Sequence, residues 1–196
     1  MRIGIDIDNT ITDTLPILKK YCQEYNEKVV KRNLVMHEDG VASYNLYDWT
    51  EEENTKFCNQ YLEQIVLQAE VKEHAKDVIA RLKEEGHQIY IISSRAEPTF
   101  QTPYETTEKF LREKGIVYDK LLVGKVEKKS SCIEYQFDVL LEDEPRYIMQ
   151  MAEFIPVILF DEIYNKQCSG KNVIRVNNWN EIYEKIQEIT KTKKEE

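Results

Sequence analysis

Near its start the chain reads Ile3-Gly4-Ile5-Asp6-Ile7-Asp8-Asn9-Thr10. A short apolar run of this kind predicts a buried strand, yet ionised carboxylates are costly in a core unless they are paired, hydrogen-bonded or bound to metal. At the carboxyl edge of a parallel sheet, where α/β folds bind their ligands, Asp6 and Asp8 could supply a nucleophile and a proton-transfer group. Alternatively, one aspartate caps a helix that starts near Thr10, but this explains one acid and not both.

Length and composition are those of one ordinary domain. The chain has 196 residues, of which 41% are hydrophobic, enough for a core and for one inserted subdomain. No stretch approaches the ~20 apolar residues of a membrane span, and the chain starts in a strand rather than in a basic and then apolar leader. We therefore expect a cytoplasmic protein without a membrane segment. Its four cysteines are widely spread, without a C-x-x-C pair, which predicts reduced thiols.

The formal charge of −9 argues against a nucleic-acid polymer as partner, because duplex binding normally uses a basic face. It does not argue against a small phosphorylated metabolite, because a metal ion and a few well-placed cations can invert the local field. The sequence leaves the oligomeric state open, a homodimer included.

Residues 12–74 are expected to form a helical insert. Apolar residues recur at helical spacing at Leu15, Leu18, Cys22, Tyr25 and Val29. A capping box at 50–53 starts a further helix. Between the two lies an aromatic stretch, Tyr44 to Trp49, which either contacts a flat part of the substrate or packs the helices of the insert together.

The remainder of the chain alternates strands and helices. Apolar runs at 89–92, 121–123, 139–141, 157–160 and 173–176 predict strands that follow the first one at 3–7. Such alternation predicts an α/β fold with a Rossmann-like, doubly wound parallel sheet. We expect residues 1–11 and 75–190 to form this core, and the charged tail at 191–196 to be disordered.

Polar side chains follow three of these strands. Asp6 and Asp8 lie at the end of the first, Ser93 ends the second, and Asp143 follows a later one. Lysines stand shortly before that later strand, at positions 125, 128 and 129. Because parallel strands end at the same edge of a sheet, these groups can converge into one site that transfers a phosphoryl group.

This pattern resembles the haloacid dehalogenase-like phosphatase superfamily. Its signatures are D-x-D-x-[TV], a Ser or Thr after a second strand, a lysine, and an acidic pair after a further strand. Residues 5–10, 91–95 and 141–143 match the first, second and fourth signatures, with glutamate at 142 where aspartate or glycine is commoner. The insert lies where type 1 caps lie. Chain size, the helical insert and the Glu-Asp-x-Pro ending resemble most the 5′(3′)-deoxyribonucleotidase group.

The resemblance implies a role for each residue. Asp6 attacks phosphorus and becomes an aspartyl-phosphate, and Asp8 protonates the leaving oxygen and then activates water. Mg²⁺ is held by Asp6, the backbone carbonyl of Asp8, and Asp143, while Ser93 and Lys128 bind the phosphoryl oxygens. The remaining expected substrate-binding residues are Asn9, Ser94 and Arg95.

Several of these positions keep a second interpretation. Lys125 is the alternative to Lys128 as the lysine of the site. Arg95 either binds substrate phosphate or pairs with a neighbouring acid. Glu142 is expected behind the site, where it holds either the metal-bound water or Lys128. The serine pair that begins at Ser93 could also be an ordinary turn at the end of a strand.

The expected activity is Mg²⁺-dependent hydrolysis of a phosphomonoester, with a (deoxy)nucleoside monophosphate as the first candidate substrate. A sugar phosphate or another small metabolite is the alternative substrate, and an inactive relative that binds a phosphorylated ligand is the alternative class. The presence of both Asp6 and Asp8 argues against an inactive relative. No P-loop is present, and an EF-hand that begins at Asp6 would need glycine at position 11, where the chain has Ile11.

Overall fold

The structure, a computed structural model, describes residues 1–195. Six parallel strands form one sheet in the order β3-β2-β1-β4-β5-β6. Their bounds are β1 Arg2–Ile5, β2 Gln88–Ser93, β3 Lys120–Val123, β4 Val139–Leu141, β5 Val157–Phe160 and β6 Val173–Val176. The parallel α/β architecture expected from the sequence is thereby confirmed, and it places β1 in the centre of the sheet.

Strand β1 illustrates why this sheet is buried on both faces. Ile3 and Ile5 are fully buried and belong to the larger apolar cluster, whereas Gly4 faces the other side. A Cβ on Gly4 would lie 2.5 Å from the ring of Phe137, so this ring approaches the backbone as only glycine allows. The central strand therefore packs tightly against helices on either face.

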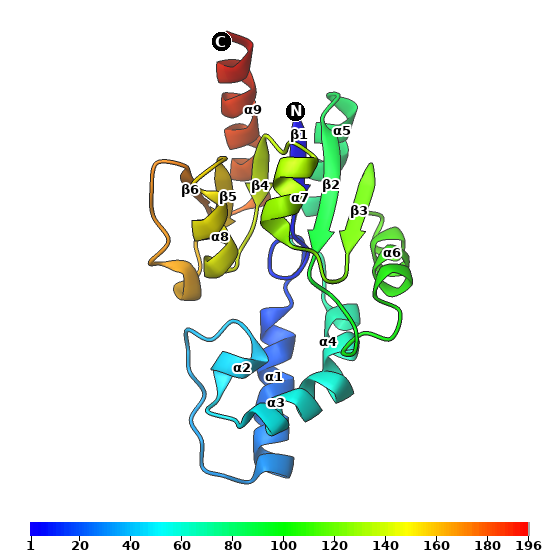
Figure 1. Cartoon of the computed structure of the whole chain (residues 1–196), viewed down its shortest axis with the longest axis vertical. Coiled ribbons are helices and arrows are strands. Elements are labelled where there is room, and N and C mark those ends of the chain that lie inside the picture. The colour runs from blue at the N-terminus through cyan, green and yellow to red at the C-terminus, as the bar shows by residue number, and fades with distance from the viewer. Residues whose placement is uncertain (196) are drawn as a thin grey trace.

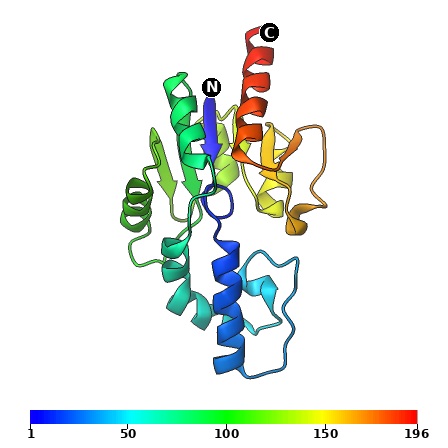
Figure 2. The same cartoon turned by 180° about the vertical axis from the view of Figure 1, so that it is seen from behind.

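Helices cover both faces of the sheet (Figures 1 and 2). The larger cluster includes side chains of α5 Ala75–Glu84, α6 Pro103–Lys114 and α9 Trp179–Glu195. A second cluster includes side chains of α7 Lys128–Glu134 and α8 Pro145–Met151. Short helical turn η3 lies at Ile163–Asn165, after β5. These two layers of helices leave the carboxyl ends of the strands open.

The segment between β1 and α5 is helical and lies beyond that open edge (Figure 1). We call it the cap. It contains α1 Leu15–Tyr25, η1 Asn26–Val30, α2 Ser43–Leu46, α3 Glu51–Phe57, η2 Cys58–Leu62 and α4 Glu63–Gln68. A third apolar cluster holds it together, with Phe57 and Ile65 fully buried. The cap thus has a core of its own, separate from the two clusters on the sheet.

Helix starts show how local sequence sets these boundaries. At α3 the capping box is formed, because Glu53 N–H donates to Thr50 Oγ1 (3.2 Å) and Thr50 N–H donates to Glu53 Oε2 (2.8 Å). The same pattern at residues 102–105 forms no such box: the Thr102 hydroxyl contacts that of Thr106 instead (3.1 Å). Helix α6 instead has proline in its first turn, a position that favours helix starts.

The end of the chain differs from the expectation of disorder at 191–196. Helix α9 continues to Glu195, and Lys193 pairs with Asp138. Lysine and glutamate are good helix formers, so a charged tail can extend a helix that is already anchored. Residue 196 lies outside the described residues.

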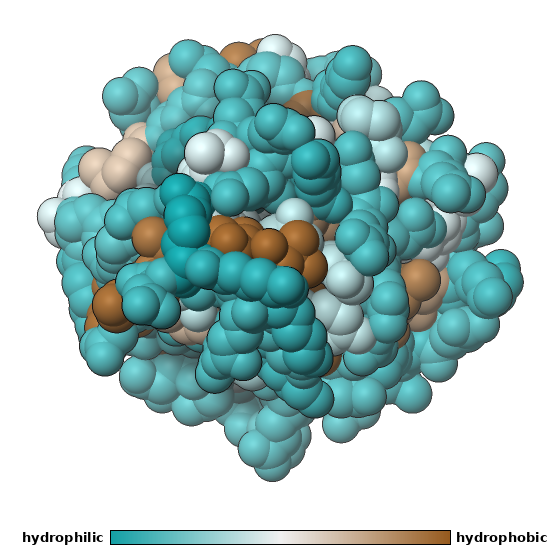
Figure 3. All heavy atoms as spheres, turned by 90° about the horizontal axis from the view of Figure 1, so that it is seen from below, coloured by the Kyte–Doolittle hydropathy of each residue, from teal (hydrophilic) through white to brown (hydrophobic). Residues whose placement is uncertain are grey.

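Seen from the cap end, the surface is mainly hydrophilic (Figure 3), and no described helix is both long and apolar enough to cross a membrane.

Candidate active site

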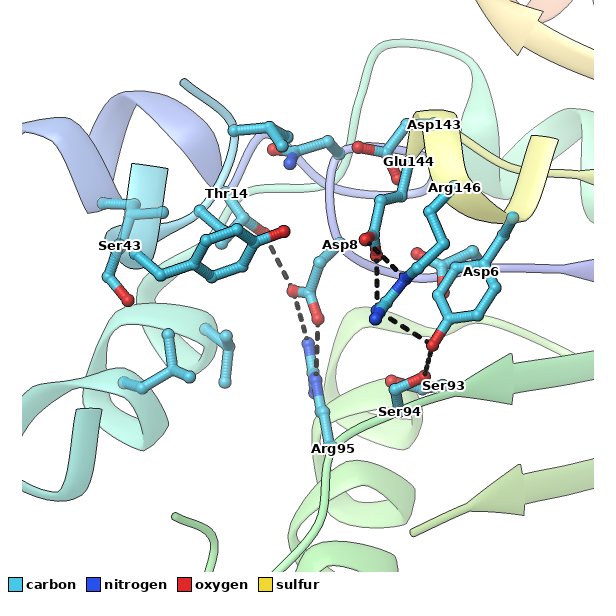
Figure 4. A pocket seen from close by; sticks show the side chains of 18 of the residues that line it. Asp6, Asp8, Thr14, Ser43, Ser93, Ser94, Arg95, Asp143, Glu144 and Arg146 are labelled. Carbon is cyan, nitrogen blue, oxygen red and sulfur yellow. Dashed lines mark hydrogen bonds and ion pairs between the residues drawn. The ribbon is translucent and has the colours of Figure 1, made fainter. Parts of the chain in front are cut away.

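The carboxyl edge of the sheet and the cap enclose a cavity of about 340 Å³. Figure 4 shows the labelled polar side chains around it, among them Asp6, Asp8 and Asp143. The structure therefore brings together residues that lie more than a hundred positions apart in the sequence. The expected site residues that line the cavity are Asp6, Asp8, Asn9, Ser93, Ser94, Arg95, Lys128, Glu142 and Asp143.

Lys128 lies at the bottom of this cavity between two carboxylates. It is the first residue of α7, and Glu127 caps that helix by accepting from the N–H groups of residues 129 and 130. Its Nζ donates to Asp6 Oδ1 (2.6 Å) and to Glu142 Oε2 (2.5 Å), with 2% of the side chain exposed. Lys125 is exposed and does not line the cavity. Of the two candidate lysines, only Lys128 contacts the acids.

The electrostatics of this group show an excess of negative charge. Burial raises the pKa of Asp6 to about 8, although Lys128 acts in the opposite direction. Burial also raises the pKa of Asp143, and the charge of Glu142 adds to the effect. For Lys128, burial lowers the pKa, but the two carboxylates outweigh burial and raise it above its ordinary value. One lysine thus does not neutralise three buried acids.

Three carboxylates meet closely enough to bind a cation. Oxygen atoms of Asp6, Glu142 and Asp143 lie within 4.8 Å of one another. Carboxylate oxygens are the ligands that Mg²⁺ prefers, and a divalent cation would remove the excess negative charge. Tyr164 donates to Asp143 Oδ2 (3.0 Å), which fixes the orientation of this carboxylate. The three carboxylates are therefore placed to hold a divalent cation, either directly or from behind the other ligands.

Glu142 lies behind the other two carboxylates. While its Oε2 accepts from Lys128, its Oε1 accepts from the backbone N–H groups of Asp143 and Glu144, both at 3.1 Å. Both of its oxygens are thus used to hold the lysine and the loop after β4. This arrangement fits a supporting role for Glu142 rather than direct contact with substrate.

Asp8 lies on the cap side of Asp6 and is held by two neighbours (Figure 4). Arg95 Nε donates to Asp8 Oδ2 (3.0 Å), and Arg95 Nη2 donates to Asp8 Oδ1 (2.8 Å). Thr14 Oγ1 also donates to Asp8 Oδ1 (2.9 Å). Of the two interpretations of Arg95, the structure shows the pairing with a neighbouring acid.

The remaining expected residues occupy different positions around the cavity. Ser93 is buried at the end of β2, whereas Ser94 is exposed and its hydroxyl lies 3.3 Å from that of Tyr147. Asn9 has a positive φ of 60°, and its Oδ1 accepts from Leu15 N–H (2.7 Å). In this structure the Asn9 amide oxygen therefore caps the first helix of the cap.

The mouth of the cavity has a polar core side and an aromatic cap side. On the core side Arg146 pairs with Glu144 (2.9 Å), and its guanidinium lies over the ring of Tyr147 (4.4 Å). On the cap side, Tyr44 lines the cavity and is 60% exposed. Burial raises the pKa of Tyr44, and the charge of Glu144 raises it further.

The aromatic stretch at 44–49 divides between the two interpretations given for it. Tyr47 is buried and stacks on Trp49, with ring centroids 5.4 Å apart, and Trp49 Nε1 donates to Asn26 Oδ1 (3.1 Å). These two rings pack the cap. Tyr44 is the aromatic residue of the stretch that lines the cavity. Apolar residues complete the cap wall, including Leu18, Leu62 and Val66.

Sequence reasoning did not single out four residues of this site. Thr14 contacts Asp8, Tyr164 contacts Asp143, and Arg146 and Tyr147 stand at the mouth. Position gave a usable signal for two of them, because Arg146 and Tyr147 directly follow the acidic signature. The partners of Thr14 and Tyr164 depend on how the chain folds back, and no local pattern marks them.

Comparisons with known proteins show the family to which the chain is similar. The sequence model of a family described as "5' nucleotidase, deoxy (Pyrimidine), cytosolic type C protein" matches residues 1–193. A Bacillus subtilis protein named "Putative nucleotidase YqfW" is 32% identical over 182 residues, which cover 91% of this chain and 90% of that protein. A similarly named Halalkalibacterium halodurans protein is 30% identical, with 92% and 89% covered.

Among solved structures, a haloacid dehalogenase-like family hydrolase from Streptococcus pneumoniae superposes with a TM-score of 0.69. The match covers 94% of this chain and 97% of that one, at 12% sequence identity. At this identity the similarity concerns the fold alone, which is the parallel sheet with helices on both faces described above.

Proposed function

The chain belongs to the family of cytosolic type C 5′-nucleotidases for deoxy (pyrimidine) nucleotides, and from this premise we propose that it is a Mg²⁺-dependent nucleotidase acting through an aspartyl-phosphate. As a member of this family it is a hydrolase of phosphomonoesters. The proposed substrate is a (deoxy)nucleoside monophosphate, and the proposed location is the cytoplasm, as in the family description. One observation carries the proposal: Asp6, Asp8, Lys128 and Asp143 line one cavity.

In the proposed reaction, a carboxylate oxygen of Asp6 forms a bond to phosphorus while the bond to the leaving oxygen breaks. Asp8 gives its proton to that oxygen, so that the nucleoside leaves as an alcohol. Water then attacks phosphorus and gives a proton to Asp8, and the bond to Asp6 breaks. Nucleoside and inorganic phosphate are the two products, and both aspartates return to their initial forms.

Asp6, Asp143 and the backbone carbonyl of Asp8 would hold the magnesium ion, which would supply charge that lets a carboxylate approach a phosphate. Lys128 would neutralise a phosphoryl oxygen, since its Nζ already lies 2.6 Å from Asp6 Oδ1. Ser93, buried at the end of β2, would donate a hydrogen bond to another phosphoryl oxygen. Phosphoryl transfer depends mainly on such positioning and charge stabilisation.

The cap would exclude water and contact the leaving group. Its wall is apolar apart from Tyr44, Ser43, Asn54 and Thr14, which suits a flat, uncharged nucleoside better than a second phosphate. All three cations of the cavity, Lys128, Arg95 and Arg146, are already paired with acids. This pairing supports a substrate with one phosphate group.

A phosphate-release screen over nucleoside monophosphates, sugar phosphates and 4-nitrophenyl phosphate tests the proposal. We expect the highest kcat/KM with a deoxynucleoside monophosphate, loss of activity with a chelator, and recovery with Mg²⁺. A flat profile or a preference for sugar phosphates would contradict the nucleotidase assignment. Absence of phosphate release from every compound would contradict the phosphatase activity itself.

A further inference from the structure

The contacts of Asp8 leave one position of its carboxylate open. An ionised carboxylate offers about four lone-pair sites, two on each oxygen. Oδ1 accepts from both Thr14 Oγ1 and Arg95 Nη2, whereas the one donor to Oδ2 among the described residues is Arg95 Nε. The clamp formed by Arg95 and Thr14 therefore occupies both sites of Oδ1 and one site of Oδ2.

Burial shows which member of the ion pair is fixed. The Arg95 side chain is 3% exposed, whereas that of Asp8 is 29% exposed. The guanidinium carbon lies 5.4 Å from the ring centre of Phe110 and 6.0 Å from that of Phe100. Arg95 is thus embedded between aromatic rings, and Asp8 is the member that faces the cavity. The arginine determines the orientation of the aspartate, rather than the reverse.

Arg95 holds Asp8 with one edge of its guanidinium, and the side chain is 3% exposed. Two of its nitrogens donate to Asp8, and the third, Nη1, is buried and has no hydrogen-bond partner among the described residues. Binding a phosphoryl oxygen with the same edge would require the guanidinium to leave Asp8. A buried charge that loses its partner is strongly destabilised, so the hydrogen-bonded contact between Arg95 and Asp8 is expected to persist during turnover, in both protonation states of Asp8.

We propose that Arg95 is a positioning residue that fixes Asp8 so that Oδ2 exchanges the proton with the leaving oxygen. The assignment rests on the proposed function, because it concerns the proton transfer of that reaction. Arg95 would act through Asp8 and would not touch the phosphate. Thr14 assists by occupying the second site on Oδ1.

The test compares two esters that differ in how much they need an acid. Thymidine monophosphate expels a strongly basic alkoxide, which requires protonation, whereas 2,4-dinitrophenyl phosphate expels a weakly basic phenolate, which does not. In Arg95→Met we expect the rate of first-turnover product release to fall about 100-fold with thymidine monophosphate, the size of a typical general-acid contribution. With the aryl ester we expect a fall of less than about threefold, because protonation contributes little there.

Two further measurements separate positioning from phosphate binding and from simple structural damage. The inhibition constant of inorganic phosphate should stay within about twofold of wild type, because Arg95 does not touch the phosphate. In an Asp8→Asn background, Arg95→Met should cause almost no additional loss, because residues that act as one unit are not additive. Arg95→Lys keeps the charge but loses the bidentate hydrogen bonds, so its activity loss should also be larger with thymidine monophosphate than with the aryl ester, but smaller than in Arg95→Met. It replaces Arg95→Met if that variant does not fold.

The matched control is Arg81→Met, because Arg81 also pairs with a glutamate and lies over an aromatic ring, 3.9 Å from the ring centre of Tyr183, but on the surface of α5. It should leave both rates unchanged. Equal losses with the two esters, a tenfold rise in the inhibition constant of phosphate, or additive losses in the double variant would each overturn the assignment of Arg95. A wild-type protein that hydrolyses neither ester would overturn the proposed function, and the assignment with it.

Discussion

The two walls of the cavity are built in opposite ways. On the sheet side, charged residues at strand ends are buried and held by ion pairs such as Lys128 with Asp6 and Glu142. On the cap side, aromatic residues such as Phe57 pack inward, and the surface offered to the cavity is mostly apolar. Under the proposed function, the sheet edge would position the reacting groups, whereas the cap would select the leaving group.

Removing the Lys128 ammonium group from the sheet wall should cause the largest loss of activity. Lys128→Met leaves the carboxylates of Asp6, Glu142 and Asp143 without their lysine, so the site should repel a phosphate. We expect kcat/KM to fall about 1,000-fold, as for the loss of a strong electrostatic contact in a transition state. Steady-state kinetics with saturating Mg²⁺ measures this loss.

Lys125→Met is the matched control, because Lys125 is exposed and lies outside the cavity. It should change kcat/KM by less than about twofold, as expected of a surface residue. A normal rate in the Lys128 variant beside an inactive Lys125 variant would show that Lys125, and not Lys128, is the lysine of the site. That result would contradict our account of the sheet wall.

Truncating a side chain in the aromatic core of the cap should lower the stability of the cap and leave that of the sheet unchanged. Phe57 is fully buried, and its ring centre lies 5.3 Å from that of Tyr25 and 5.2 Å from that of Trp49. Phe57→Ala should lower the free energy of opening of the cap by about 3 kcal/mol. Hydrogen exchange should then accelerate in residues 15–68 and stay unchanged in the central strands.

A comparable truncation in the sheet domain, Phe137→Ala, serves as the reference. Phe137 packs against the central strand at Gly4, so this variant should accelerate exchange throughout the protein. If Phe57→Ala also accelerated exchange in β1 and β4, the cap and the sheet would unfold as one unit. The separation between the two walls would then be wrong.

Tyr44 lines the cavity from the cap side, and we predict that its loss has a moderate effect on the choice of substrate. Because Tyr44 is 60% exposed, Tyr44→Ala should change the free energy of unfolding by less than about 0.5 kcal/mol. It should raise KM for a nucleoside monophosphate about tenfold, as for one aromatic contact with a base, and leave KM for 4-nitrophenyl phosphate nearly unchanged.

Tyr104→Ala supplies the control for Tyr44, because Tyr104 is similarly exposed on α6 and does not line the cavity. Its KM values should match those of wild type for both substrates. An unchanged nucleotide KM in Tyr44→Ala would remove the cap aromatic residue from substrate recognition and leave only the apolar wall.

The smallest predicted effect concerns stability and lies at Asp138, at the amino edge of the sheet. Burial raises the pKa of Asp138, but hydrogen bonds from Lys193 and from Arg2 N–H outweigh burial and lower the pKa below its ordinary value. Since the carboxyl is more acidic in the folded state, its contribution to stability is present above the pKa of the unfolded chain and disappears as pH falls through the folded pKa.

Urea unfolding of wild type and Asp138→Asn at a series of pH values measures this effect. Near pH 7 wild type should be the more stable protein, by less than about 1 kcal/mol. The difference should shrink below about pH 4, where the unfolded carboxyl starts to be protonated. A difference that grows toward acid pH would contradict the lowered pKa, and with it the contrast to the raised pKa values of Asp6 and Asp143.

The sheet wall was largely predictable from sequence, because its residues follow apolar runs. Parallel strands end at one edge, so the positions of Asp6, Ser93 and Asp143 after such runs were sufficient to place them together. Choosing between Lys125 and Lys128 required the structure, because it depends on where α7 begins and on how that helix is rotated. The sequence also left two alternatives for Arg95, phosphate binding and pairing with an acid, because the contacts of its side chain depend on the three-dimensional arrangement.

The cap was predictable as a helical segment but not in its contacts. Helical spacing and the box at Thr50 marked its helices, yet nothing in the stretch from Tyr44 to Trp49 distinguished a ring that packs inward from one that faces the cavity. That distinction depends on the path of the loop before α2. The helical tail was missed because it extends α9, which is anchored by its packing on the sheet, and a short charged segment does not reveal such a tertiary effect.

The central claim is that the strand-end aspartate Asp6 becomes covalently phosphorylated, and trapping that intermediate tests it most directly. Protein that is turning over a nucleoside monophosphate with Mg²⁺ would be quenched in acid and reduced with borohydride, which converts an aspartyl-phosphate to homoserine, before peptide mass spectrometry. We predict the mass change at Asp6 in wild type and its absence in Asp6→Asn and in protein without substrate. A mass change at another carboxylate, or active enzyme without any modified residue, would contradict the account.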